Sequence, residues 1–126
     1  MIRIILSLLF LLTVFSISKF IFDPAYLYYE LPWLDIPMHV IGGICVAFLV
    51  TSLLLYKKIK VSFLYIVVWY MIIAFSWEIY EHILNYMHVK TWYGSRMPLE
   101  DIVDSLYDFL NGFIGMSIFY LFMKKK

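Results

Sequence analysis

Eight polar side chains recur at helical spacing along three stretches of this sequence, and they are of the types that bind metals or carry protons. Asp35 and His39 lie four residues apart in the first stretch. The other two stretches contribute Glu78, Glu81 and His82, and then Asp104, Asp108 and Asn111. Residues three or four apart share one face of a helix. Each stretch therefore presents one polar stripe on an otherwise apolar surface.

Carboxylates gathered with imidazoles support three interpretations. Side chains that hydrogen-bond across helices hold membrane helices together, with each bond contributing about 0.6 kcal/mol. The second interpretation is metal binding, because a divalent cation removes the repulsion between carboxylates. A site of His with Asp or Glu suits Zn²⁺, Mn²⁺ or Fe²⁺, whereas a site built of oxygen ligands alone suits Mg²⁺ or Ca²⁺. Crowded acids can also share protons or hold another ligand. The candidate metal ligands are Asp35, His39, Glu78, Glu81, Asp104 and Asp108.

The rest of the chain indicates that lipid surrounds these stripes. Of its 126 residues, 64% are hydrophobic, against roughly 45–50% in soluble domains. A transmembrane helix needs about 20 mostly apolar residues, and four ranges meet that requirement: 4–22, 36–56, 61–84 and 102–123. We predict an all-α integral membrane protein, a four-helix bundle in one domain spanning residues 1–126. The alternative for the first range is a secretory signal, whose removal would leave three helices to enclose the polar groups.

The charges are segregated along the chain. If four helices cross the membrane in turn, seven of the ten basic residues fall on one side and all nine carboxylates fall on the other half. The seven are Arg3, Lys57, Lys58, Lys60, Lys124, Lys125 and Lys126. Short loops that carry Lys and Arg stay in the cytoplasm. We therefore predict that both termini are cytoplasmic and that the polar pocket lies on the external side.

Several other features narrow the function. The formal net charge of +1 argues against nucleic acid as a partner. Cys45 is the only cysteine, so we interpret it as a small buried apolar residue. Three histidines are too few for the metal box of membrane desaturases. Gly42 and Gly43 predict a close contact between helices, because small residues let membrane helices approach.

Three motifs in order resemble those of a known group of proteins. The motifs are Asp35-x-x-x-His39 with Gly43, then Trp77-Glu78-x-x-Glu81, then Asp104-x-x-x-Asp108-x-x-Asn111-x-x-x-Gly115. This order, over about residues 33 to 118, resembles the YjdF-like family of small inner-membrane proteins and the wider VanZ-like pattern, in which Arg96 matches an Arg. Glu81 replaces the Gln common in VanZ-like chains, and Gly112 stands where a second Asp or Asn is expected.

The resemblance implies a role at the cell envelope, since VanZ-like proteins are associated with resistance to glycopeptide antibiotics, but it implies no particular reaction. We expect an external polar pocket that holds a divalent cation and binds or acts on an anionic lipid or cell-wall precursor. Arg96 and an aromatic belt would receive the headgroup at its mouth; the belt comprises Tyr26, Tyr28, Tyr29 and Trp33. The alternative is a non-enzymatic envelope protein in which the Asp/Glu/His network only holds the helices together.

Overall fold

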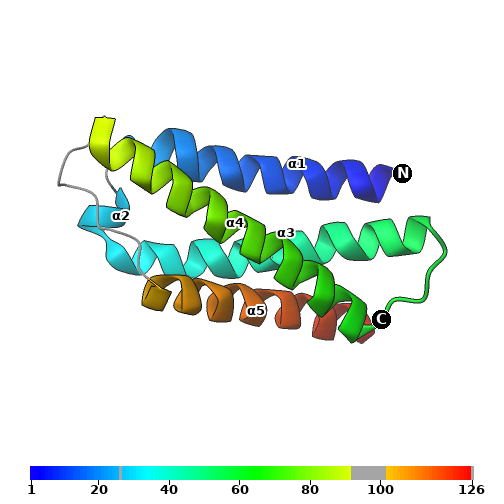
Figure 1. Ribbon diagram of the computed structural model, residues 1–126. Helices are drawn as coiled ribbons and strands as arrows, with labels where there is room; N and C mark the ends of the chain where they lie inside the picture. Colours follow the sequence, from blue (N-terminus) through cyan, green and yellow to red (C-terminus); the bar gives the residue numbers. More distant parts are fainter. Residues whose placement is uncertain (26, 92–101, 126) are drawn as a thin grey trace.

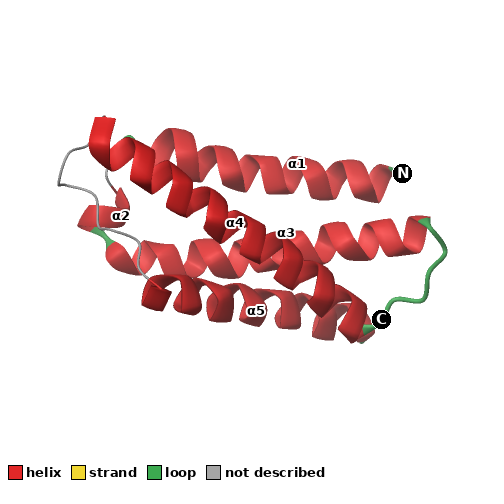
Figure 2. Ribbon diagram, in the orientation of Figure 1, coloured by secondary structure: helices red, strands yellow, loops and turns green. Residues whose placement is uncertain are grey.

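Four long helices and two short ones make up the structure, a computed structural model that describes residues 1–25, 27–91 and 102–125, with the backbone alone for 84–91. The helix α1 (Ile2–Ile17) continues into a π-helical turn, η1 (Ser18–Phe22). The short helices α2 (Leu27–Glu30) and η2 (Pro32–Leu34) lead into α3 (Asp35–Tyr56), α4 (Phe63–Thr91) and α5 (Ile102–Lys124). The described residues contain no strand (Figure 2).

Four segments are long and apolar enough to cross a membrane: Ile2–Phe22, Pro32–Tyr56, Phe63–Ile83 and Ile102–Lys124. This confirms the predicted all-α fold with four membrane-crossing helices. Large apolar side chains such as Leu9, Phe75 and Leu121 are more than half exposed on the outside of the bundle. Such a surface is stable in lipid, where apolar side chains need no cover from water.

The four long helices differ from their predicted bounds by one to several residues, and the differences in α3 and α4 have local reasons. Helix α3 begins at Asp35, and Pro37 is accommodated within its first turn, where backbone N–H groups have no partner within the helix. Helix α4 begins only at Phe63 because Ser62 precedes it as a cap, its Oγ accepting a bond of 3.3 Å from the Tyr65 amide. Helix α4 then continues to Thr91, past the expected end at 84, because no Gly or Pro interrupts this stretch.

The long helices place opposite charges at opposite ends of the bundle (Figure 1). Both termini and the connection from α3 to α4 lie at one end, which we call the basic end because Arg3, Lys57, Lys58, Lys60, Lys124 and Lys125 belong to it. We call the other the acidic end. It holds α2, the starts of α3 and α5 and the last turns of α4. The described carboxylates all belong to this half: Asp23, Glu30, Asp35, Glu78, Glu81, Asp104 and Asp108.

The helices α3 and α5 run parallel and form the most extensive contact in the described structure. Gly43 of α3 lies so close to Gly112 of α5 that a Cβ on Gly43 would collide with the Gly112 carbonyl oxygen. A Cβ on Gly115 would meet the Val40 carbonyl oxygen in the same way. The core continues from this contact toward the basic end, with Val46, Ala47, Val50, Leu54, Ile66, Tyr70 and Met116 buried together.

The helix α4 crosses the bundle diagonally (Figure 1). Near its start Phe63 packs against Phe113 and Tyr120 of α5. Further along, the Tyr70 hydroxyl donates a bond of 2.8 Å to the Phe109 carbonyl oxygen. At the acidic end Trp77 packs edge-on against Phe15 of α1, with ring centroids 5.7 Å apart. Helix α4 therefore contacts α5 along much of its length and α1 only at the acidic end.

The two adjacent glycines of α3 provide a direct test of the contact between α3 and α5. We expect Gly43→Ala to lower the free energy of unfolding by about 1–3 kcal/mol, the usual cost of overpacking a tight contact. Gly42→Ala is the matched control, because nothing lies within 4 Å of a Cβ built there. Thermal unfolding in detergent measures both. Equal midpoints for the two variants would contradict the close approach of α3 and α5 at Gly43.

Candidate functional site

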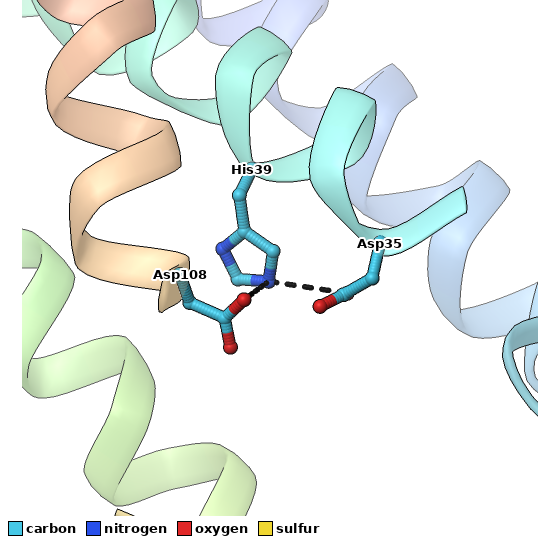
Figure 3. Close-up of side chains that lie close together, drawn as sticks. All are labelled: Asp35, His39 and Asp108. Carbon is cyan, nitrogen blue, oxygen red and sulfur yellow. Dashed lines mark ion pairs between the residues drawn. The ribbon is translucent and has the colours of Figure 1, made fainter. Parts of the chain in front are cut away.

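Asp35, His39 and Asp108 converge at the acidic end of the contact between α3 and α5. The His39 Nε2 atom lies 3.3 Å from Asp35 Oδ1 and 3.3 Å from Asp108 Oδ1 (Figure 3). The Asp108 side chain is 6% exposed, whereas that of Asp35 is 43% exposed. The cluster therefore has a buried side on α5 and an open side at the start of α3.

The glycine contact explains why these three side chains meet. His39 precedes Gly43 by four residues and Asp108 precedes Gly112 by four, so each lies one turn from the glycine on its own helix and on about the same face. Because α3 and α5 are parallel, both turns lie toward the acidic end. Asp35 lies one turn before His39, on the same face of α3. A wider separation of the two backbones would move His39 away from Asp108.

A second polar group forms around Lys19, a residue that we did not include in the predicted pocket. Lys19 Nζ lies 3.2 Å from Asp23 Oδ2 and 3.2 Å from Glu81 Oε1. It also lies 5.7 Å from the centroid of the Trp77 ring. The structure thus pairs Glu81, a predicted pocket residue, with a cation of η1. The spacing of Lys19 and Asp23, four apart on one helix, was the signal in the sequence that could have identified this group.

Glu78 is the most buried carboxylate of α4. The residue is 6% exposed, and its Oε2 atom has no hydrogen-bond partner among the described residues. Ser105 of α5 lies beside Glu78, and its hydroxyl interacts with the Glu78 carboxylate. Sequence analysis missed Ser105, although its position three residues before Asp108 places it on the same face of α5.

The remaining predicted residues lie apart from the three-residue cluster or outside the described residues. His82 is exposed, and its Nδ1 lies 3.1 Å from the Glu78 carbonyl oxygen of its own helix. Asp104 is exposed and Asn111 is partly buried on α5. Arg96 lies outside the described residues. Of the six candidate metal ligands, Asp35, His39 and Asp108 offer ligand atoms that all lie within 4.8 Å of one another.

The aromatic belt is divided between exposed and buried positions. Tyr29 and Trp33 are 55% and 61% exposed at the acidic end, and Tyr26 lies outside the described residues. The Tyr28 hydroxyl instead pairs with the Ser18 hydroxyl at 2.7 Å, which ties α2 to η1. Burial raises the pKa of Tyr28 to about 12, so the phenol is neutral and keeps its proton for this bond near neutral pH.

The Lys19 group gives a prediction about stability. Lys19→Met leaves Asp23 and Glu81 without their shared cation, and we expect the free energy of unfolding to fall by about 1–3 kcal/mol. This is below the roughly 3–5 kcal/mol of a fully buried pair, because the Lys19 side chain is 17% exposed. Adding Glu81→Gln to that variant should restore part of the loss. Unchanged thermal unfolding of Lys19→Met would show that the ion pairs do not stabilise the bundle.

Comparison with known proteins places the chain in a family without assigning an activity. No curated protein and no solved structure matches it. A family model described as "Predicted membrane protein (DUF2238)" matches residues 2–125. The matched range contains all four candidate membrane spans and the Asp35, His39 and Asp108 cluster. With nearly its whole length matched by that model, the chain belongs to the DUF2238 family of membrane proteins.

Proposed function

We propose that this membrane protein binds a divalent cation between Asp35, His39 and Asp108 and uses it to bind or act on an anionic headgroup. The observation that carries the proposal is the position of His39 Nε2, at 3.3 Å from a carboxylate oxygen on each side. One imidazole nitrogen and two carboxylate oxygens form a donor set that suits Zn²⁺, Mn²⁺ or Fe²⁺.

The distances favour a metal site over a simple hydrogen-bonded pair. Hydrogen bonds between charged N–H donors and carboxylates are usually about 2.7–2.9 Å long. Ligand atoms bound at about 2.0–2.2 Å to a tetrahedral Zn²⁺ lie roughly 3.3–3.5 Å from one another. Both contacts of His39 Nε2 match the second spacing. Its single N–H, in addition, could point well at only one of the two oxygens.

The surroundings of the cluster suit an anionic headgroup that approaches from the acidic end. Three protein ligands leave at least one position on the cation for an oxygen of the ligand, as in catalytic zinc sites. The Asp35 side chain is 43% exposed at this opening, and Tyr29 and Trp33 are exposed in the short segments that precede α3, as expected for side chains at headgroup level. The motif resemblance to YjdF-like and VanZ-like proteins supports a lipid or cell-wall precursor as the ligand, with Arg96 as a further contact.

A specific observation also favours the structural alternative. A protonated His39 would pair with Asp35 on its own helix and with Asp108 on α5. In that case the network holds α3 against α5, and the protein is a non-enzymatic component of the envelope. Such a network would be stabilised by hydrogen bonds alone and would need no cation.

Metal content separates the two functions. If Asp108 is a ligand, Asp108→Asn removes a carboxylate oxygen that the cation needs, and affinity should fall by about 10-fold or more. If the network is structural, the same change keeps the size of the side chain, and no metal is bound before or after it. Metal stoichiometry and thermal stability would be measured in detergent with Mg²⁺, Mn²⁺ or Zn²⁺.

The control is Glu30→Gln, which neutralises an exposed carboxylate of α2. It should leave both metal content and stability unchanged. A parent protein that binds none of the three cations and gains no stability from them would rule out the metal function and favour the structural one.

We further propose that the basic end faces the cytoplasm, which puts the cluster on the external side. The basic residues of the termini and of the connection between α3 and α4 support this orientation. Reporter fusions after Lys60 and after Lys126 should read as cytoplasmic. A fusion near Tyr93, which lies outside the described residues, should read as external. A cytoplasmic signal at Tyr93 would reverse the orientation and move the cluster to the inner side.

A further inference from the structure

A groove lies between α1 and α4 on the outer surface of the bundle, with a volume of about 520 Å³. Its lining residues are Phe15 of α1 and Ile72, Ile73, Ser76, Trp77 and Tyr80 of α4. They all belong to the candidate membrane spans Ile2–Phe22 and Phe63–Ile83. Water would find few polar partners in such a groove, and an empty groove would forfeit dispersion contacts along its walls. The occupant that suits it is the hydrocarbon chain of a bilayer lipid.

The course of the two helices gives the groove a polar end and a deep end. Helices α1 and α4 converge at the acidic end, where Phe15 contacts Trp77, and they diverge toward the basic end (Figure 1). Trp77 also packs against Tyr80, with ring centroids 5.5 Å apart, and Trp and Tyr favour the headgroup level. From Tyr80 to Ile72 the helix spans about 12 Å. This is most of the roughly 15 Å that one leaflet contributes to the hydrocarbon core.

The Lys19 group lies at the polar end of the groove, because Lys19 Nζ is 5.7 Å from the centroid of the Trp77 ring. Two carboxylates contact this one ammonium, so the group carries more negative than positive charge. The contacts use Asp23 Oδ2 and Glu81 Oε1, which leaves the second oxygen of each carboxylate for another donor. All three side chains are partly exposed, and a lipid headgroup can therefore reach them.

We propose that this groove binds a phospholipid with a primary-ammonium headgroup, of the phosphatidylethanolamine class. One acyl chain lies along α4, and the ammonium pairs with Asp23 and Glu81. A primary ammonium donates up to three hydrogen bonds and compensates the surplus negative charge of the Lys19 group. Lys19 itself has a third N–H that can donate to the lipid phosphate. An anionic headgroup without an ammonium would instead be repelled by the surplus carboxylate. This site is independent of the metal site proposed above.

The test is native mass spectrometry of the full chain in detergent with equal amounts of phosphatidylethanolamine and phosphatidylglycerol. We expect one phosphatidylethanolamine per chain, bound about 10-fold more tightly than phosphatidylglycerol, the usual gain from a hydrogen bond between charged groups. Ser76→Phe fills the groove with a ring and should lose the bound lipid. Thr13→Phe is the matched control and should keep it. Both hydroxyls are exposed and bond to a carbonyl four residues earlier, but Thr13 lines a hollow formed by α1 and η1 alone.

Asp23→Asn tests the headgroup contact separately from the groove. The variant keeps the pair between Lys19 and Glu81 and removes the surplus negative charge. The lipid should stay bound through its acyl chain, while the preference for phosphatidylethanolamine falls from about 10-fold toward equal binding of the two lipids.

Several results would overturn the proposal. Equal binding of the two lipids by the parent, or tighter binding of phosphatidylglycerol, would exclude the ammonium contact. Lipid that stays in a folded Ser76→Phe variant, or is lost from Thr13→Phe instead, would exclude the groove. A dimer of the parent that Ser76→Phe dissociates would place a second copy of the chain there. If Ser76→Phe does not fold, the lipid preference still decides, because a preference that Asp23→Asn leaves unchanged would also overturn the proposal.

Discussion

The close approach of α3 and α5 at Gly43, Gly112 and Gly115 is the constraint on which the rest of the structure depends. Membrane helices gain little from burying apolar surface against one another, because lipid is equally apolar, so backbone contact through small residues determines which faces pack. Here that contact leaves no room for a Cβ at Gly43 or Gly115. It fixes the register of two parallel helices, and it thereby places His39 and Asp108 within 3.3 Å of each other.

Contacts between helices account for two departures from the motif resemblance. Gly112 stands where a second Asp or Asn was expected, and it is buried between Gly43 and the Tyr70 hydroxyl, so a larger side chain would collide with Tyr70 of α4. Glu81, which replaces a Gln, pairs with Lys19 of η1. The carboxylate at this position therefore matches a cation from another helix, which an uncharged amide could not do as strongly.

The fold could be predicted from the sequence because helix length and hydropathy are local properties, and the four membrane-crossing helices were predicted on that basis. The pairing of Asp35 with His39 could be predicted for the same reason, because the two residues are four apart on one helix. Contacts between side chains of different helices could not be predicted in this way. Nothing in the sequence near Glu81 indicates Lys19, and nothing near Glu78 indicates Ser105. His82 lies beside Glu78, as the spacing of four residues predicts, with its Nδ1 3.1 Å from the Glu78 carbonyl oxygen, and it is exposed. The diagonal path of α4 carries its last turns away from α5 and toward α1, and periodicity alone does not reveal such a crossing.

The parallel course of α3 and α5 has an electrostatic consequence for the acidic end. Each helix carries a macrodipole equivalent to roughly half a positive charge at its N-terminus, and both of these N-termini lie at the acidic end (Figure 1). Asp35 and Asp104 occupy the first turns of α3 and α5, where that field favours negative charge. Because α1 and α4 bring their negative C-terminal ends to the same end of the bundle, this field acts locally, on an anion that reaches the first turns of α3 and α5. There the backbone of two helices stabilises negative charge that the neighbouring carboxylates alone would repel.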